Sequence, residues 1–540
     1  MKKDRFTEPV RYCLSGYRGF SGGKSMRVPH MSVRISANLI LPMLLAAAIP
    51  AFAQELKIGD QPVLPGHINQ VDITNYNKQT NTIIHNKLNF RQIFNAGEFL
   101  FEARFNKLDG QGRPAATGAP PPTSRVADQP PFIRTSAPDS NSCAGCHNQP
   151  RTGGAGDFVA NVFVLAQVLD PVTFSVSSDF SDERNTLGMM GSGPIELLGR
   201  EMTKDLLSIK AAAIAGATAS GQDVTTPLTS KGVSFGSITA HPGGSVDTSQ
   251  VQGVDADLII KPFHQKGVVR SVREFTVNAY NHHHGMEAVE RFGDDQPCLS
   301  CNHTGTHDFD QDGVEDELSI GDITAATIYQ AGLNTPGQVL PNNRNIRDAI
   351  ERGEQRFDAI GCTSCHIPAL TLNDATFCEP YDLNPAGTFS DISQSYCFNL
   401  TQVGEKPRLE KAPHTQKGAI VRAYTDLKRH QICDANNPHY CNETKIQNGV
   451  PTDQFITRKL WDAGNSAPYG HRGDLTTIGD AILAHGGEAT DIRNNFFNLS
   501  DTEKAEIVEF LKSLQMLPPG SPRIKHVSLN DFSKIFEDSE

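Results

Sequence analysis

The chain has 540 residues, of which 38% are hydrophobic, and it carries a formal net charge of −12 at pH 7. Its length exceeds that of one ordinary domain, so two or more domains are expected. The acidic balance argues against nucleic acid and anionic membrane surfaces as partners. It is compatible with a small redox protein as electron donor or acceptor.

An apolar run of residues 35–49 follows Arg34 and ends at Ala51-Phe52-Ala53. A basic residue, a short apolar run and a small-x-small site are typical of a secretory signal. The run is too short to favour a membrane span. We therefore expect residues 1–53 to be a cleaved signal peptide, the protein to be periplasmic or secreted, and no span to remain after cleavage. An uncleaved anchor is the alternative.

A short pattern, Gly-Glu-x-x-Phe, occurs at residues 97–101 and again at residues 353–357. Each copy reads as part of a helix that precedes a cysteine motif. A stretch rich in Pro, Gly and Ala, residues 109–140, separates the first copy from its motif and is expected to be a surface loop. The pattern indicates a weak internal repeat in which a helix leads into the motif.

The motif itself is Cys-x-x-Cys-His, which occurs at Cys143, Cys146 and His147 and again at Cys362, Cys365 and His366. This spacing is that of covalent c-type haem attachment. Each thiol adds to one vinyl group of the porphyrin, and the histidine that follows becomes the proximal iron ligand. Two copies behind an export signal predict two covalently bound haem c groups. A pair of redox or zinc CxxC sites is the alternative.

The region between the two motifs contains an expected helix and an expected insertion. Apolar residues of 193–215 recur near helical spacing, and this helix carries Glu196. Residues 217–250 are rich in Thr, Ser and Gly and predict a loop or a small β insertion. Because a simple electron carrier does not need so large an enclosure, the length of this region favours an enzyme.

Three adjacent histidines, His282, His283 and His284, lie between the two haem motifs. Adjacent side chains point in different directions on a helix or strand, so the three cannot all serve one metal. We expect one of them to line a haem pocket, and we take His283 as the candidate. The alternative is that all three are surface or capping residues.

Six cysteines lie outside the motifs and the exported segment: Cys298, Cys301, Cys378, Cys397, Cys433 and Cys441. An even number in an oxidising compartment suggests disulfides. Nearness in sequence favours the last four as two successive pairs, although sequence does not fix connectivity. The first two form a CxxC followed by Asn302, which favours a local disulfide; a third haem, ligated by His303 or His307, is the alternative.

An acidic stretch follows, with Asp308, Asp310, Asp312 and Asp316 at positions 1, 3, 5 and 9 of an EF-hand-type loop. Glycine stands at position 6, as such a loop requires. Position 12 is Ser319 in place of the usual bidentate Glu. The pattern predicts either a structural calcium ion or a plain acidic turn.

The C-terminal part contains Ser466-Ala-Pro-Tyr469-Gly-His471-Arg-Gly473, and a closing helix that begins with a capping box at Ser500. With two CxxCH motifs and a signal peptide, this segment resembles the bacterial dihaem cytochrome c peroxidase superfamily. That group includes the dihaem enzyme that matures methylamine dehydrogenase. The resemblance is strong over residues 343–517 and around 140–150, and thin over 155–340.

The resemblance implies axial ligands for the C-terminal haem. In those peroxidases a methionine fourteen residues beyond the motif histidine is the distal ligand, and here that position, counted from His471, holds His485. We therefore expect His366 and His485 to be the two axial ligands. Such a haem is six-coordinate and lower in potential than one with methionine.

The resemblance also implies a mainly α fold of two cytochrome c-type haem domains with loop-rich insertions. The expected boundaries are 54–342 for the N-terminal haem domain, 343–520 for the C-terminal one, and 521–540 for a tail.

The implied function is peroxidase-like oxidoreduction of peroxide or another small oxidant. The N-terminal haem, with His147 proximal, would be the open catalytic one, and Glu196 and His283 are candidates for the distal base. A non-catalytic dihaem electron carrier and an oxygen-dependent haem oxygenase acting on an organic substrate are the alternatives.

Overall fold

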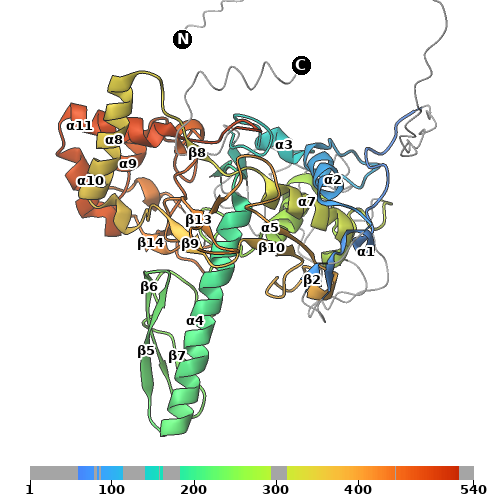
Figure 1. Cartoon of the computed structure of the whole chain (residues 1–540), viewed down its shortest axis with the longest axis horizontal. Coiled ribbons are helices and arrows are strands. Elements are labelled where there is room, and N and C mark those ends of the chain that lie inside the picture. The colour runs from blue at the N-terminus through green and yellow to red at the C-terminus, as the bar shows by residue number, and fades with distance from the viewer. Residues whose placement is uncertain are drawn as a thin grey trace, which may run out of the picture. The chain divides into compact units, whose positions relative to one another are not determined.

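The computed structural model describes residues 59–77, 82–83, 87–112, 140–156, 159–161, 183–292, 313–443 and 446–521 (Figure 1). Four sequence-based expectations fall wholly or largely on residues outside these ranges: the signal peptide, the surface loop of residues 109–140, the Cys298–Cys301 pair, and Asp308, Asp310 and Asp312 of the acidic loop. Of the expected tail only Ser521 is described.

Helices account for the larger share of the described regular structure. The α-helices are α1 (Gln70–Ile73), α2 (Phe90–Glu102), α3 (Cys143–Cys146), α4 (Ser192–Ser220), α5 (Val272–Ala279), α6 (Val289–Phe292), α7 (Ile320–Gly332), α8 (Arg344–Ala359), α9 (Ile478–Leu483), α10 (Thr490–Phe497) and α11 (Asp501–Ser513). A π-helical turn, Tyr280–His284, continues α5.

Several of these helices begin at a polar side chain that caps the first turn. Ser500 accepts a hydrogen bond from the backbone N–H of Glu503, whose side chain returns a bond to the cap, which confirms the predicted capping box of α11. Asn89 and Ser319 form the same arrangement at α2 and α7. The boundaries of these helices are therefore set locally by the sequence.

Helix α7 is buried along its whole length and packs against α2 and α5. At the crossing with α2, a Cβ atom added to Gly97 would lie 2.1 Å from the carbonyl oxygen of Ala325. Only glycine permits so close an approach of two helix backbones. The glycine of the first Gly-Glu-x-x-Phe pattern thus seats α2 on α7.

Helices α8 and α11 repeat this arrangement in the C-terminal part, where they lie side by side (Figure 1). A Cβ atom added to Gly353 would lie 1.9 Å from the carbonyl oxygen of Glu506. Ile350 and Phe357 of α8 and Phe510 of α11 are buried in the core between these helices. The internal repeat expected from the sequence is therefore a repeat of helix crossings.

The strands are short and form several small antiparallel sheets. They are β1 (Tyr76–Asn77), β2 (Thr82–Ile83), β3 (Val159–Asn161), β4 (Glu183–Asn185), β5 (Val224–Ser230), β6 (Val233–Ala240), β7 (Val246–Asp247), β8 (Gly337–Gln338), β9 (Leu370–Leu372), β10 (Thr376–Glu379), β11 (Tyr396–Asn399), β12 (Glu410–Lys411), β13 (Ala419–Val421), β14 (Arg429–Gln431), β15 (Gln454–Ile456) and β16 (Leu514–Gln515). Two sheets have three strands, β5-β6-β7 and β12-β13-β9, and the other described strands are paired two by two.

These sheets correct the expected fold class. The structure has 37% helix and 16% strand, so the prediction of a mainly α fold is wrong. The stretch 217–250 is the expected β insertion, whose sheet packs along α4 (Figure 1). The cysteine-bearing stretch 370–456, which has little helical periodicity, also folds into hairpins. Each of these hairpins depends on pairing between two strands that are separated in the chain. The periodicity of a single stretch therefore did not reveal the hairpins.

Two disulfides hold the hairpins of the C-terminal half. Cys378 and Cys397 are joined and lie directly opposite each other on β10 and β11. Cys433 and Cys441 are joined across a short loop. Both pairs confirm the pairing that nearness in sequence favoured.

The described residues from Asp60 onward form one compact unit. Within the described ranges, no helix has the length and apolar character that a bilayer span requires. The division into two haem domains at residue 343 stays a prediction.

Candidate functional site

The first CxxCH motif lies at the end of the loop that follows α2. Cys143 and Cys146 are the first and last residues of α3, and His147 follows directly. The Nδ1 atom of His147 lies 2.9 Å from the carbonyl oxygen of Leu187 and 3.3 Å from that of Gly154. Burial lowers the pKa of His147 to about 4, so the ring is neutral. Nδ1–H therefore donates to the carbonyls, which leaves Nε2 as the ligand nitrogen.

The second motif is built in the same way. Cys362 begins a 3₁₀ turn after α8, and the Nδ1 atom of His366 lies 3.0 Å from the carbonyl oxygen of Tyr424. Burial, with a smaller contribution from His485, lowers the pKa of His366 to about 4. The neutral ring again donates from Nδ1 and keeps Nε2 for a metal.

The phenylalanine of each Gly-Glu-x-x-Phe pattern packs against the histidine of its own motif. The ring centroids of Phe101 and His147 are 6.1 Å apart, and those of Phe357 and His366 are 6.2 Å apart. The two copies of the repeat thus place equivalent aromatic rings beside equivalent imidazoles. In each copy the glycine permits the close helix crossing, and the phenylalanine packs against the imidazole of the motif histidine.

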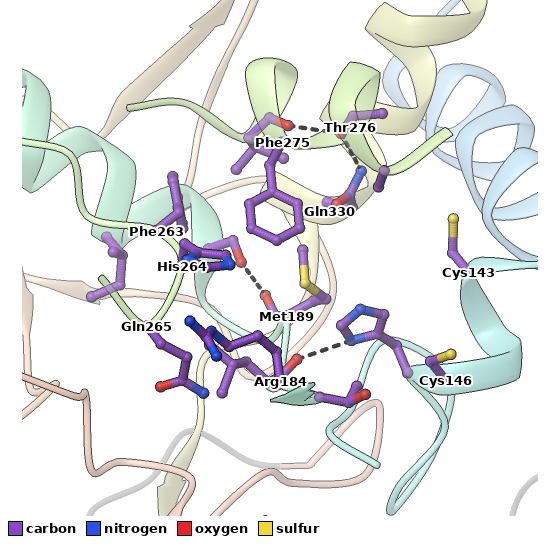
Figure 2. A pocket seen from close by; sticks show the side chains of 18 of the residues that line it. Cys143, Cys146, Arg184, Met189, Phe263, His264, Gln265, Phe275, Thr276 and Gln330 are labelled. Atoms are coloured by element: carbon purple, nitrogen blue, oxygen red, sulfur yellow. Dashed lines mark hydrogen bonds between the residues drawn. The ribbon is translucent and has the colours of Figure 1, made fainter. Parts of the chain in front are cut away.

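Each motif opens into a large cavity. The N-terminal cavity has about 1400 Å³ of empty space and is lined by all three residues of the first motif, with Phe263, Phe275 and other side chains (Figure 2). The C-terminal cavity has about 1510 Å³ and is lined by all three residues of the second motif. Each motif histidine therefore lies at a cavity that its own two cysteines also line.

The residues present fit haem better than the alternatives. Burial raises the pKa of the Cys143 and Cys362 thiols to about 12, whereas a redox CxxC needs a lowered thiol pKa. Among the described residues, the one cluster of donor atoms close enough to share a metal ion is Cys365, Asp426 and His430, which includes neither motif histidine. At each motif, a pair of thiols, an oriented imidazole and a cavity with apolar lining suit attached haem.

His485 lines the C-terminal cavity together with His366. The Nδ1 atom of His485 lies 2.8 Å from the carbonyl oxygen of Ala481, one turn back in α9. When Nδ1 bonds that carbonyl, Nε2 is left available as a ligand nitrogen. Both rings thus line one cavity, and the charge of either would lower the pKa of the other. Axial ligation by both residues stays a prediction that this arrangement favours.

His471 of the Ser-Ala-Pro-Tyr motif also lines the C-terminal cavity and is 1% exposed. It packs against Phe455 at 4.7 Å and Tyr440 at 5.6 Å between ring centroids. Neither ring nitrogen has a hydrogen-bond partner within the described ranges. A buried imidazole of this kind calls for a polar group inside the cavity, which a bound haem provides.

The histidine triplet divides between cavity and core. His283 and His284 line the N-terminal cavity, and His282 is buried away from it. The Nδ1 atom of His284 lies 2.7 Å from the carbonyl oxygen of Ser140, and its Nε2 lies 3.5 Å from the sulfur of Cys143. His283 is therefore the member of the triplet best placed to act within the cavity.

Glu196 lies in a buried network of ion pairs. It accepts from the guanidinium of Arg200 at 2.5 Å, and Arg200 also bonds Glu379 at 2.9 Å. Its other oxygen accepts from the backbone N–H of Val272 at 2.7 Å. Glu196 does not line the N-terminal cavity, although its neighbour Ile195 does. Its catalytic role stays a prediction, and this position favours a structural role instead.

Two further residues at the cavities carried no recognisable sequence pattern. His264 lines the N-terminal cavity across from Cys143 and Cys146, and its backbone has a φ of +70° (Figure 2). His430 lines the C-terminal cavity, with Nδ1 2.8 Å from Glu488 and Nε2 2.9 Å from Asp426. His430 is paired with Glu488, 58 residues away, as well as with nearby Asp426, and a single histidine at each position forms no motif.

Of the acidic loop, Asp316 is described, with a φ of +53°. The remaining predicted calcium ligands fall on residues that the structure does not describe, and calcium binding stays a prediction.

Residues 382–514 match the model of the family described as "Di-haem oxidoreductase, putative peroxidase". The match contains the Ser-Ala-Pro-Tyr motif and His485, and it confirms the resemblance to the dihaem peroxidase superfamily. It supports a dihaem, peroxidase-like oxidoreductase as the class of protein. No curated protein matches the chain.

Two solved structures are similar to the chain. Hydrazine synthase of Kuenenia stuttgartiensis is 12% identical, with a TM-score of 0.33, and the alignment covers 85% of this chain and 97% of that chain. A MauG-like protein associated with microbial copper homeostasis is 15% identical, with a TM-score of 0.22, covering 62% of this chain and 92% of that chain. TM-scores this low do not establish a shared fold.

Proposed function

We propose that the chain is an exported dihaem c-type oxidoreductase with peroxidase-like activity. The N-terminal haem would be the open, catalytic one, and the C-terminal haem, held between His366 and His485, would relay electrons. One observation carries this proposal. Two cavities, each with an oriented motif histidine, share a wall formed by residues 185–187 and 456–459.

The residues that line the two cavities support different roles for the two haems. His485 and His366 both line the C-terminal cavity, which supports the proposal that they are the two ligands of the relay haem. The N-terminal cavity gathers apolar side chains, Phe263 and Phe275 among them, around the polar His283. An apolar cavity with few polar groups is the usual setting for a small substrate.

Haem bound at these sites would supply iron that binds peroxide and exchanges electrons. The bond from His147 Nδ1–H to the carbonyl of Leu187 holds the imidazole so that Nε2 faces the bound group. His283 would accept the proton of the incoming peroxide and return it to the departing oxygen. Phe263 and Phe275 would keep bulk water from the reacting atoms.

The test compares peroxide turnover of the haem-loaded wild type with that of the His283→Gln variant. Loss of a general base lowers the rate about 10²–10⁴-fold, and the haem content should stay unchanged. The matched control is His241→Gln, because the His241 ring is partly exposed, pairs with Asp223 and lines neither cavity.

A parallel Glu196→Gln variant tests the candidate that sequence favoured. A large loss of peroxide turnover in Glu196→Gln, with His283→Gln still active, would identify Glu196 as the distal base. A wild type that holds two haems and turns over no peroxide would instead favour the non-catalytic electron carrier.

A further inference from the structure

The wall between the two cavities carries two basic side chains in sequence. Arg458 and Lys459 line both cavities, as do Gln265 and residues 185–187. They lie two and three residues beyond the end of β15, which pairs with β14. The same two cations therefore face both candidate haem sites.

Among the residues that the structure describes, Asp462 is the one carboxylate paired with these two cations. Lys459 Nζ lies 2.7 Å from Asp462 Oδ2 and 3.0 Å from the carbonyl oxygen of Gly188. Arg458 reaches the same Asp462 oxygen at 3.8 Å. One carboxylate thus serves two cations. Burial lowers the pKa of Arg458 and brings that of Lys459 to about 8, so loss of hydration outweighs the attraction of Asp462 for both groups.

The third cation nearby does not change this balance. Arg184 lines the N-terminal cavity but forms a buried ion pair with Glu443. A buried excess of positive charge is costly unless an anion compensates it. The wall is therefore built to receive a carboxylate or another anion from within the cavities.

Haem itself brings such anions. Its two propionates lie on the edge of the porphyrin opposite the vinyl groups that the cysteines bind. Figure 2 shows Arg184, His264 and Gln265 across the N-terminal cavity from Cys143 and Cys146. Gln265 is also part of the shared wall. Attachment at the cysteines would thus direct the propionate edge toward the wall.

We propose that Arg458 and Lys459 bind propionate carboxylates of both haems, so that one cationic pair joins the two groups. This inference rests on the proposed binding of two haems. A cation beside a haem disfavours the more positive ferric state and so raises the reduction potential. The pair would therefore raise both potentials together and hold the propionate edges of the two haems toward each other.

The experiment is a spectroelectrochemical titration of the haem-loaded protein, with haem per chain measured on the same sample. In the Lys459→Gln variant both haem potentials should shift to more negative values. Lys459→Arg, which keeps the charge, should restore them. The matched control is Lys417→Gln, because Lys417 pairs with Asp374 at 3.3 Å and lines neither cavity.

A shift in the potential of one haem alone, or of neither haem, would overturn the inference. If that protein still holds two haems per chain, the proposed function is not affected. Fewer than two haems in the wild type would overturn both. Lys459→Gln also removes the bond to Gly188, so Arg458→Gln repeats the test with less structural loss. It should shift both potentials in the same direction, and potentials that stay unchanged in this variant would count against the shared pair.

Discussion

The Nδ1 atom of His147 lies 2.9 Å from the carbonyl oxygen of Leu187, a residue that lines both cavities. The bond fixes the tautomer of the proximal ring and also ties it to the wall that separates the two sites. The bond from His366 to Tyr424 repeats the orientation at the second site. The two sites are thus copies of one local design, joined through a common wall.

The helix crossings should tolerate no side chain at the glycines of the repeat. Gly97→Ala and Gly353→Ala would place a Cβ within 2.1 Å and 1.9 Å of a backbone oxygen. We expect each to lose about 1–3 kcal/mol of unfolding free energy, the usual cost of overpacking, as measured by thermal or denaturant unfolding. Gly216→Ala is the control, because its Cβ would meet nothing closer than 3.8 Å. A neutral Gly353→Ala would contradict the close crossing.

The ligand role of His485 predicts a change in the potential of one haem. His485→Met should raise the reduction potential of the C-terminal haem, because methionine favours the ferrous state. A redox titration followed by visible absorption would measure the shift, and the N-terminal haem serves as the internal reference. An unchanged potential, with both haems retained, would remove His485 from the axial position.

The pair of carboxylates on His430 predicts a pH-dependent contribution to stability. Burial alone would lower the pKa of His430, but the bond to Asp426 and the proximity of Cys365 raise it to about 11. In the haem-bound protein Cys365 would be a thioether, so Asp426 and Glu488 keep the direction upward. A raised folded-state pKa means that the stabilisation is full below pH 6.5 and is lost as pH rises toward the folded value.

The measurement is the unfolding free energy at pH 6 and pH 9. Wild type should lose stability between these values by more than His430→Asn does, because the variant lacks the charged hydrogen bonds, each worth about 1.5–3 kcal/mol. His241→Asn, on the exposed β insertion, should behave as wild type. Equal pH dependence in wild type and His430→Asn would refute the charged state of His430.

The two disulfides should contribute unequally to stability. Cys378 and Cys397 are 19 residues apart, whereas Cys433 and Cys441 are 8 apart. A disulfide that closes a longer loop removes more entropy from the unfolded chain. For a loop as long as the first, this stabilises the fold by about 3 kcal/mol. Replacing the first pair with serine should therefore lower the unfolding free energy more than replacing the second. The reverse order would show that loop closure does not set the difference.

Sequence could predict the parts of the site that depend on local chemistry. The CxxCH spacing places Cys143, Cys146 and His147 on one short helix, and the capping box at Ser500 marks the start of α11. The groups that complete the sites come from elsewhere. Arg200, which bonds Glu196, also bonds Glu379, 179 residues further along the chain, and His430 meets Glu488, 58 residues away.

The small sheets escaped prediction for the same reason. Strands such as β9 and β13 gain stability only by pairing with each other, and their sequences carry no long alternating pattern. Arg458 and Lys459 likewise look like ordinary surface residues in the sequence. Their proposed role depends on the wall between the two cavities, which segments distant in the sequence form together.

Low-temperature EPR of the ferric protein, with haem per chain determined on the same sample, tests the central assignment most directly. The proposal predicts two haems per chain, one high-spin signal from the open N-terminal site and one low-spin signal from the site of His366 and His485. Two low-spin signals would contradict an open catalytic haem in the resting protein and favour the electron carrier. Fewer than two haems would contradict the dihaem assignment itself.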